Sequence, residues 1–279
     1  MFSKLIRHDF KATLRIGVPM LIALAIVCVV GALNSVLMTT LMYTNVGDIG
    51  SSMLLTLITT MLSVVIYIAI FAIPMVVQVV ILVDYYKSTA SDEAYLTFTL
   101  PVSPTQILFS KLLNGIVWTF IMLAGSALAG GIISFVSFLV SEAMTPPDAT
   151  PPEATPFDWS MFGSITLVVV LVVLYIIVSI IVSQIMYFMS ISLGSSISKK
   201  NKAVSAVGFI FLTNFVYGFV NYLIMVITAL ISVEIGIKTE NVFLAIDIAI
   251  IIMIVVSSAL GALFFFLTRR ALEKRLNLA

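Results

Sequence analysis

The stretch ITLVVVLVVLYIIVSIIVSQIMYFMSISL, residues Ile165–Leu193, contains no charged side chain. An α-helix rises about 1.5 Å per residue, so about 20 apolar residues are enough to cross the roughly 30 Å hydrocarbon core of a bilayer. An unpaired backbone N–H or C=O group in lipid costs several kcal/mol, and an apolar run of this length therefore has to be helical. This segment predicts a transmembrane α-helix.

Five more apolar runs of similar length occur along the chain. The composition agrees with them, since 61% of the residues are hydrophobic, 10% are charged and the mean hydropathy is +1.22. A soluble domain carries roughly 25% charged residues. No run alternates between apolar and polar residues in the way that a membrane β-barrel strand does. We predict an all-α, polytopic membrane protein that forms a single transmembrane domain over residues 1–279, with six transmembrane helices at 18–42, 53–83, 107–140, 163–193, 204–233 and 242–268.

The basic residues predict the orientation of these helices. With six spans, thirteen of the fourteen Lys and Arg residues fall on one side of the membrane, and Lys238 is the exception. Loops rich in Lys and Arg stay in the cytoplasm. We therefore expect a multi-pass protein of the plasma membrane with both termini in the cytoplasm. Residues 141–160, which hold five of the nine prolines and no basic residue, are expected to form an extended external loop.

The N-terminal residues 1–16 predict an amphipathic helix. At about 100° per residue, apolar residues such as Leu5, Ile6 and Phe10 take one side, and a narrow cationic stripe takes the other. Such a helix lies on the membrane surface, here on the inner leaflet. A positive flank that only sets the topology is the alternative. Gly17 and Pro19 are expected to bend the chain before the first span. The cationic stripe consists of Lys4, Arg7, Lys11 and Arg15.

The inner loop 84–106 carries signals for a short cytoplasmic helix. Asp92 and Glu93 suit the positive N-terminal end of a helix, and apolar side chains follow them before Pro101. The sequence SPTQ at 103–106 then predicts a capping box with proline at the first helical position of the next span. Exposed apolar residues on a loop need a cover. Either the loop folds back onto its own spans or it docks a partner protein.

Catalytic and metal-binding residues are scarce. The chain has one cysteine, Cys28, and one histidine, His8, which leaves no disulfide framework, zinc site or His-dependent nucleophile. The phosphate-binding sequence G-x-x-x-x-G-K-[ST] does not occur. We therefore expect no catalytic residue, no metal site, no cofactor bound by this chain and no nucleic-acid partner.

Polar residues inside the spans offer two interpretations. Uncharged polar side chains follow helical faces, and they can line a substrate path or form hydrogen bonds between helices. Small residues between 125 and 131 predict a seam of close helix packing. Asp247 is the one acid that lies clearly within a span. The possible path residues are Gln78, Ser183, Asn214, Tyr217 and Asn221.

The inner loop and its surroundings resemble a known family. The segment EAYLTFTLPVSPTQILFSKLL at 93–113 and the closing TRRALEKRLNL at 268–278, together with six spans and a basic entry helix, look like the permease subunits of type-2 ATP-binding-cassette (ABC) transporters. In that family the first inner loop carries a coupling helix that docks into a groove on a separate ATPase subunit. The resemblance implies that the docking surface comprises Asp92, Glu93, Tyr95, Leu96, Phe98, Leu100 and Pro101.

The resemblance also implies partners and an activity. ATP and Mg²⁺ are expected on the ATPase subunit, and a second permease chain, identical or homologous, is expected to complete the transporter. Export of a lipid, a hydrophobic drug or an antimicrobial peptide suits this family. Two other classes stay open: an ion-coupled secondary carrier that uses Asp247, and a non-transporting membrane scaffold or immunity protein.

Overall fold

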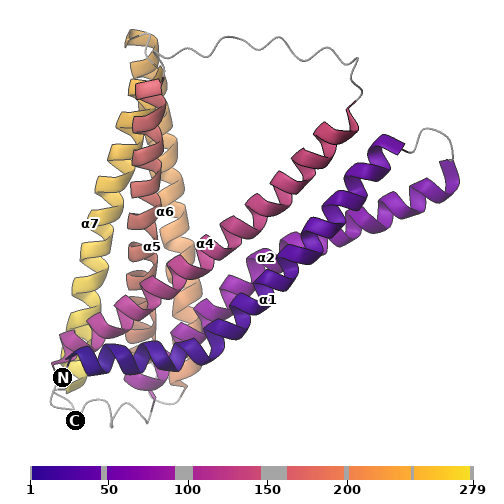
Figure 1. Ribbon diagram of the computed structural model, residues 1–279. Helices are drawn as coiled ribbons and strands as arrows, with labels where there is room; N and C mark the ends of the chain where they lie inside the picture. Colours follow the sequence, from indigo (N-terminus) through magenta and orange to yellow (C-terminus); the bar gives the residue numbers. More distant parts are fainter. Residues whose placement is uncertain are drawn as a thin grey trace. The chain divides into compact units, whose positions relative to one another are not determined.

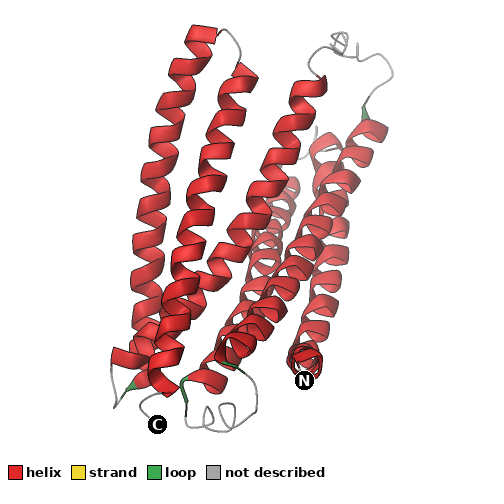
Figure 2. Cartoon of the chain, turned by 90° about the vertical axis from the view of Figure 1, so that its left-hand side faces the viewer, coloured by secondary structure: helices red, strands yellow, loops and turns green. Residues whose placement is uncertain are grey.

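The computed structural model describes residues 2–44, 49–91, 103–145, 162–197, 201–239 and 242–276. These residues form long helices, and no strand occurs in this part of the chain (Figures 1 and 2). The helices are α1 (Phe2–Thr44), α2 (Ile49–Thr89), α4 (Pro104–Met144), α5 (Phe162–Ile197), α6 (Lys202–Thr239) and α7 (Val242–Leu276).

All six helices are long and apolar enough to cross a bilayer, which confirms the predicted number of spans and the multi-pass, helical fold. Each helix has between 35 and 43 residues. A helix of 35 residues measures about 50 Å, more than the roughly 30 Å of hydrocarbon. The helices therefore extend past the predicted spans. Residues 194–197, for example, are helical although hydropathy assigns them to an inner loop, because helical backbone bonds continue beyond the apolar run.

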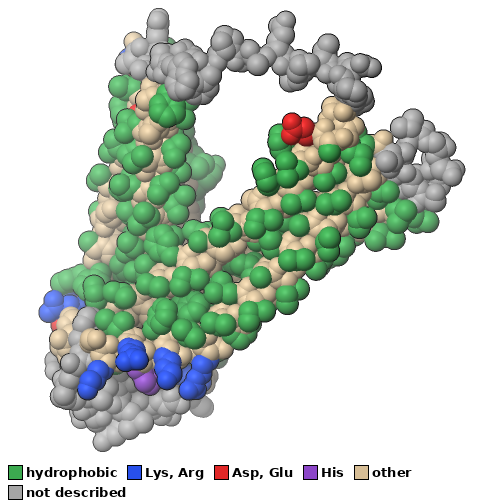
Figure 3. All heavy atoms as spheres, viewed as in Figure 1, with side chains coloured by type: hydrophobic (Ala, Val, Ile, Leu, Met, Phe, Trp, Pro, Cys, Tyr) green, Lys and Arg blue, Asp and Glu red, His purple; other side chains and the backbone are tan. Residues whose placement is uncertain are grey.

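Apolar side chains cover the outer surface of these helices. Phe71, Phe211 and Phe215 are each more than 70% exposed, and every helix exposes further Leu, Ile, Val or Met residues (Figure 3). A soluble monomer rarely exposes contiguous apolar patches of more than a few hundred Å². These surfaces are suited to lipid, in agreement with the hydropathy of the sequence.

The described residues divide into two compact units. Unit 1 takes Met1–Ile6, Leu82–Ile116 and Pro156–Ala279, and unit 2 takes Arg7–Ile81 and Val117–Thr155. The division falls inside α1, α2 and α4, so each of these helices contributes one part to each unit.

In unit 2, α1, α2 and α4 pack around a small apolar core. Leu24, Ile66, Ile70 and Ile133 are all buried in this core. Gly31 allows the close approach, because a Cβ atom there would lie 2.5 Å from the Ile133 side chain and 3.1 Å from Ile66. Membrane helices use small residues in this way, since van der Waals packing drives their association.

The small residues between 125 and 131 form only half of the predicted packing seam. A Cβ atom at Gly125 would lie 2.9 Å from the Leu24 side chain of α1, and the Cys28 thiol donates to the backbone oxygen of Ala129 at 3.8 Å. A Cβ atom at Gly130 or Gly131 would meet no atom of another described helix within 4 Å, so neither glycine makes a close approach. The seam thus follows the side of α4 that carries positions 125 and 129.

Helix α1 is continuous across residues 17–19, where a bend was expected to separate the N-terminal helix from the first span. Gly17 and Pro19 both lie inside α1, and the helix axis changes direction in its N-terminal part (Figure 1). A proline inside a helix removes one backbone hydrogen bond and bends the helix. The indole of Trp118 fills the space over Gly17, where a Cβ atom would meet the ring at 2.2 Å, and it stacks on Phe10 with ring centroids 5.5 Å apart.

In unit 1, α5, α6 and α7 pack against one another. Gly194 of α5 lies directly on the backbone of α6, and a Cβ atom there would meet Ala206 Cα and the Ser205 oxygen at 2.9 Å. The Ser205 hydroxyl donates to the Gly194 carbonyl at 2.6 Å. Gly261 of α7 similarly accommodates Val182 of α5.

Candidate functional site

The helices that flank the inner loop are described, although the loop itself is not. The predicted docking residues Asp92, Glu93, Tyr95, Leu96, Phe98, Leu100 and Pro101 lie outside the described residues. Helix α2 ends before them at Thr89, and α4 begins after them at Pro104.

The start of α4 confirms the predicted capping box. The backbone N–H of Gln106 donates to the Ser103 hydroxyl at 3.3 Å, and the backbone N–H of Ser103 donates to Gln106 Oε1 at 3.1 Å. These reciprocal bonds satisfy two backbone donors that a helix start otherwise leaves unpaired. The chain therefore enters α4 at a fixed residue.

A buried polar cluster joins the two helix ends that flank the loop. Lys111 Nζ of α4 lies 2.6 Å from Asp84 Oδ2 of α2, and only 10% of the lysine side chain is exposed. The neighbouring Tyr85 is fully buried, and its hydroxyl lies 2.7 Å from Ser192 Oγ of α5. Its ring stacks on Phe188 of α5, with centroids 3.9 Å apart and planes 1° from parallel. We call Asp84, Tyr85, Lys111, Phe188 and Ser192 the loop-base cluster.

The loop-base cluster ties the end of α2 and the start of α4 to α5. A charged hydrogen bond from a buried lysine and a stacked, hydrogen-bonded tyrosine both hold their partners in one geometry. Sequence reasoning treated Asp84 and Lys111 separately and missed the pair. A signal was present, because they are opposite charges at the two helix ends that a single loop connects.

The N-terminal cations lie on one side of α1. Lys4, Arg7, Lys11 and Arg15 are all exposed, and basic side chains form a row near the start of the chain (Figure 3). Asp9 and Thr13 are buried on the other side of the same turns, and Phe10 is half-buried against Trp118. The cations are thus free to face solvent or lipid head groups, and the position of this segment on the inner leaflet stays a prediction.

Three of the five predicted path residues form hydrogen bonds within their own helix. Ser183 donates to the carbonyl of Ile180 at 2.9 Å, Asn214 to Ile210 at 2.8 Å, and Asn221 to Tyr217 at 2.8 Å. Local bonds of this kind satisfy a polar side chain inside a span without a substrate.

The other two path residues lie in different surroundings. Gln78 belongs to unit 2 and accepts a hydrogen bond from the Thr119 hydroxyl at 3.2 Å. Tyr217 packs edge-on against Phe264 and lines an apolar cavity of about 310 Å³ between α5, α6 and α7. The lining of that cavity includes none of the other four residues. Of the four predicted path residues in unit 1, the cavity lining thus includes only Tyr217.

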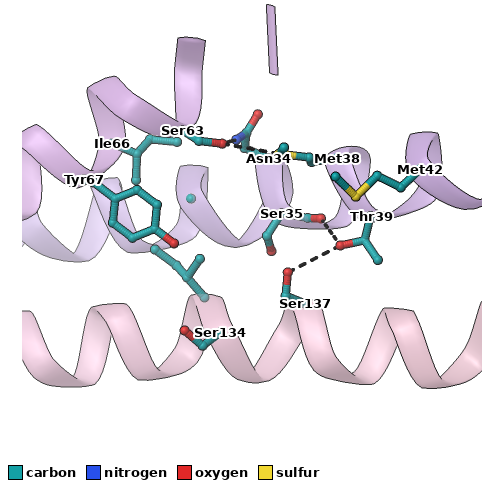
Figure 4. A pocket seen from close by; sticks show the side chains of 12 residues that line it. Asn34, Ser35, Met38, Thr39, Met42, Ser63, Ile66, Tyr67, Ser134 and Ser137 are labelled. Atoms are coloured by element: carbon teal, nitrogen blue, oxygen red, sulfur yellow. Dashed lines mark hydrogen bonds between the residues drawn. The ribbon is translucent and has the colours of Figure 1, made fainter. Parts of the chain in front are cut away.

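A second cavity, in unit 2, has a polar lining that includes none of the five predicted path residues. It has a volume of about 500 Å³ and lies among α1, α2 and α4 (Figure 4). Ligand sites in proteins commonly have volumes of about 300–1,000 Å³. The spacing of Ser35 and Thr39, one helical turn apart, is a signal that marks one wall. Six residues of the lining carry hydroxyl groups: Ser35, Thr39, Ser63, Tyr67, Ser134 and Ser137.

The described residues contain no group of three His, Cys, Asp or Glu side chains that could hold a metal ion.

Comparisons with protein-family models, with curated proteins and with solved structures found no match.

Proposed function

We propose that this chain is the membrane-spanning permease subunit of a type-2 ABC transporter, driven by a separate ATPase subunit that docks on the inner loop. ATP and Mg²⁺ then bind to that partner. A second permease chain completes the complex, because one chain has one such loop and ABC transporters work with two ATPase subunits. Export of a lipid, a hydrophobic drug or a peptide is the activity that we expect.

The observation that carries this proposal is the loop-base cluster. If a partner subunit moves the loop, the transmembrane helices on either side of the loop have to move with it. The Asp84–Lys111 pair joins the two helices that bracket the loop, and Tyr85 joins one of them to α5 through Ser192 and Phe188. Buried, hydrogen-bonded contacts of this kind move as a unit. They support a role of the loop as a coupling element.

The charge distribution supports the same arrangement. Positive-inside orientation places residues 84–106 and the exposed cations of α1 in the cytoplasm, where an ATPase subunit has access to them. The cations of α1 then lie at the anionic inner leaflet of the plasma membrane. This orientation leaves residues 141–160 outside.

Copurification tests the docking assignment. Tagged protein is isolated from native membranes in mild detergent, and copurified chains are identified by mass spectrometry. We expect an ATPase with a phosphate-binding G-x-x-x-x-G-K-[ST] sequence, and we expect Leu96→Asp plus Phe98→Asp to reduce its recovery at least tenfold. The control, Met53→Asp plus Leu54→Asp, also adds two carboxylates, at exposed positions of α2 that the predicted topology places on the other side of the membrane. Equal ATPase recovery with both variants would refute docking on the loop.

Asp247 favours an ion-coupled carrier as a second candidate. Its Oδ1 atom is buried in α7 and has no hydrogen-bond partner among the described residues. Acids inside a span commonly mark proton or ion pathways. If the chain is a carrier, vesicles without ATP take up substrate in response to an ion gradient, and Asp247→Asn abolishes that uptake. The permease that we propose shows no transport in the same vesicles.

A further inference from the structure

Four of the six hydroxyl groups that line the cavity of unit 2, those of Ser35, Thr39, Ser63 and Ser137, present mainly hydrogen-bond acceptors to it. The Ser35 hydroxyl donates to the carbonyl of Ala32 and the Thr39 hydroxyl to the carbonyl of Ser35, each at 2.8 Å. The Ser63 hydroxyl donates to the carbonyl of Thr59 at 2.9 Å. Each hydroxyl has one proton and two lone pairs. Their protons are thus engaged within the protein. Both lone pairs of Ser35 remain, whereas Ser63 uses one to accept from Asn34 and Thr39 uses one in its contact with Ser137.

The hydrogen bond between Ser137 and Thr39 also leaves acceptors on Ser137. Their hydroxyl oxygens lie 3.3 Å apart, between α4 and α1 (Figure 4). Since the Thr39 proton is engaged by the carbonyl of Ser35, Ser137 is the donor in this pair. The lone pairs of Ser137 therefore remain as acceptors as well.

Asn34 lies in the wall of the cavity and orients the Ser63 hydroxyl. Its Nδ2 donates to the Thr59 carbonyl at 3.2 Å and to Ser63 Oγ at 2.8 Å. The carbonyl accepts only, so this contact fixes which end of the amide is the nitrogen. The remaining Oδ1 atom has no hydrogen-bond partner among the described residues, although Asn34 is 3% exposed. Buried amide oxygens are normally paired.

The rest of the lining restricts the charge of a ligand. It contains no Lys, Arg, Asp or Glu, and its other members are apolar. A buried ion needs a counter-charge to offset its desolvation. The lining offers neither a basic side chain for an anion nor a carboxylate for a cation. The apolar walls, formed by Met38, Met42, Ile66 and Ile133, suit a hydrocarbon chain.

We propose that this cavity binds a neutral amphiphilic lipid, whose head-group hydroxyls donate hydrogen bonds to the serine and threonine oxygens and whose chain lies against the methionine and isoleucine side chains. The cavity lies among transmembrane segments, where such lipids are available. This inference does not depend on the proposed transport function, because a bound lipid can equally serve a carrier or a scaffold.

Photolabelling in nanodiscs tests the proposal. The full chain is reconstituted in phosphatidylcholine with a trace of dioleoylglycerol that carries a diazirine near the head group, and labelled peptides are mapped by mass spectrometry. We expect labelling to concentrate on residues 31–42, 63–67 and 133–137. Unlabelled dioleoylglycerol should compete, whereas dioleoyl phosphatidic acid and the O-methyl ether of dioleoylglycerol should compete at least fivefold less well, since one is an anion and the other has no donor. Equal competition by all three would show that only the chains are recognised, and it would overturn the proposal.

Hydroxyl removal provides an independent check. Ser35→Ala plus Ser137→Ala removes two acceptors, and we expect labelling to fall about fivefold or more, the effect of losing roughly one hydrogen bond. Thr60→Ala plus Ser141→Ala is the matched control, because these hydroxyls are exposed, bond to their own helices and do not line the cavity. Both variants should remain monodisperse with similar melting temperatures. Equal labelling of the two folded variants would overturn the head-group assignment, and so would labelling spread evenly over all six helices.

Discussion

At the scale of single residues, the Asp84–Lys111 pair shows how a charge is accommodated near the end of a span. The lysine side chain is 10% exposed and the aspartate 37% exposed, so the two partners have different access to water. Loss of a partner is costly mainly for the group that stays buried. The two halves of this pair are therefore not equivalent.

This asymmetry predicts different effects of the two single substitutions. Asp84→Asn leaves the buried ammonium without its carboxylate and should destabilise the protein by about 2 kcal/mol. Lys111→Met keeps an unbranched side chain of similar length, and it leaves a carboxylate that can reach water, so we expect a cost of about 1 kcal/mol or less. Thermal unfolding of purified protein in detergent measures both, and the double variant should be more stable than Asp84→Asn alone. A larger loss for Lys111→Met would contradict this account of the pair.

At the scale of elements, the sequence predicts some features well and others poorly. Length and hydropathy are properties of a segment alone, so six spans could be found, and the SPTQ capping box of α4 is a local motif that the structure confirms. Hydropathy does not predict which side of each helix packs against its neighbours, because lipid and the protein interior are equally apolar. Ser35 of α1 and Ser137 of α4, for example, line the same cavity. Hydropathy gives no information on how each helix is rotated about its own axis.

The crossing of α5 and α6 provides a prediction at this scale. A methyl group at Gly194 would meet Phe209 Cβ at 2.7 Å and two backbone atoms of α6 at 2.9 Å, and the backbone atoms cannot move aside without shifting the helix. Gly194→Ala should therefore destabilise the protein by about 1–3 kcal/mol and weaken the bond from Ser205 to the Gly194 carbonyl. Gly208→Ala is the control in α6, because its Cβ position is open, and helix propensity should make it neutral or stabilising by up to about 1 kcal/mol. Melting temperatures in detergent measure both effects, and equal shifts would refute the close crossing.

At the scale of the whole molecule, the distribution of charge is the property on which the orientation depends. Thirteen of fourteen basic residues fall on one side if the spans alternate, and such a bias keeps that side in the cytoplasm. The same orientation brings the loop between α2 and α4 within reach of a cytoplasmic ATPase. Cysteine accessibility tests it directly, since Cys28, half-buried in α1, is the only native cysteine and Cys28→Ala gives a cysteine-free background.

In that background, Glu142→Cys at the end of α4 and Asn201→Cys before α6 place single thiols at exposed positions, which the predicted topology assigns to opposite sides of the membrane. A membrane-impermeant maleimide applied to intact cells should label Glu142→Cys, and it should label Asn201→Cys only after the membrane is permeabilised. Denatured samples provide the control that each thiol can react. Labelling of Asn201→Cys in intact cells would reverse the orientation. The loop between α2 and α4 would then lie outside the cell, where no ATP-driven subunit could act on it, and the proposed function would fail together with the topology.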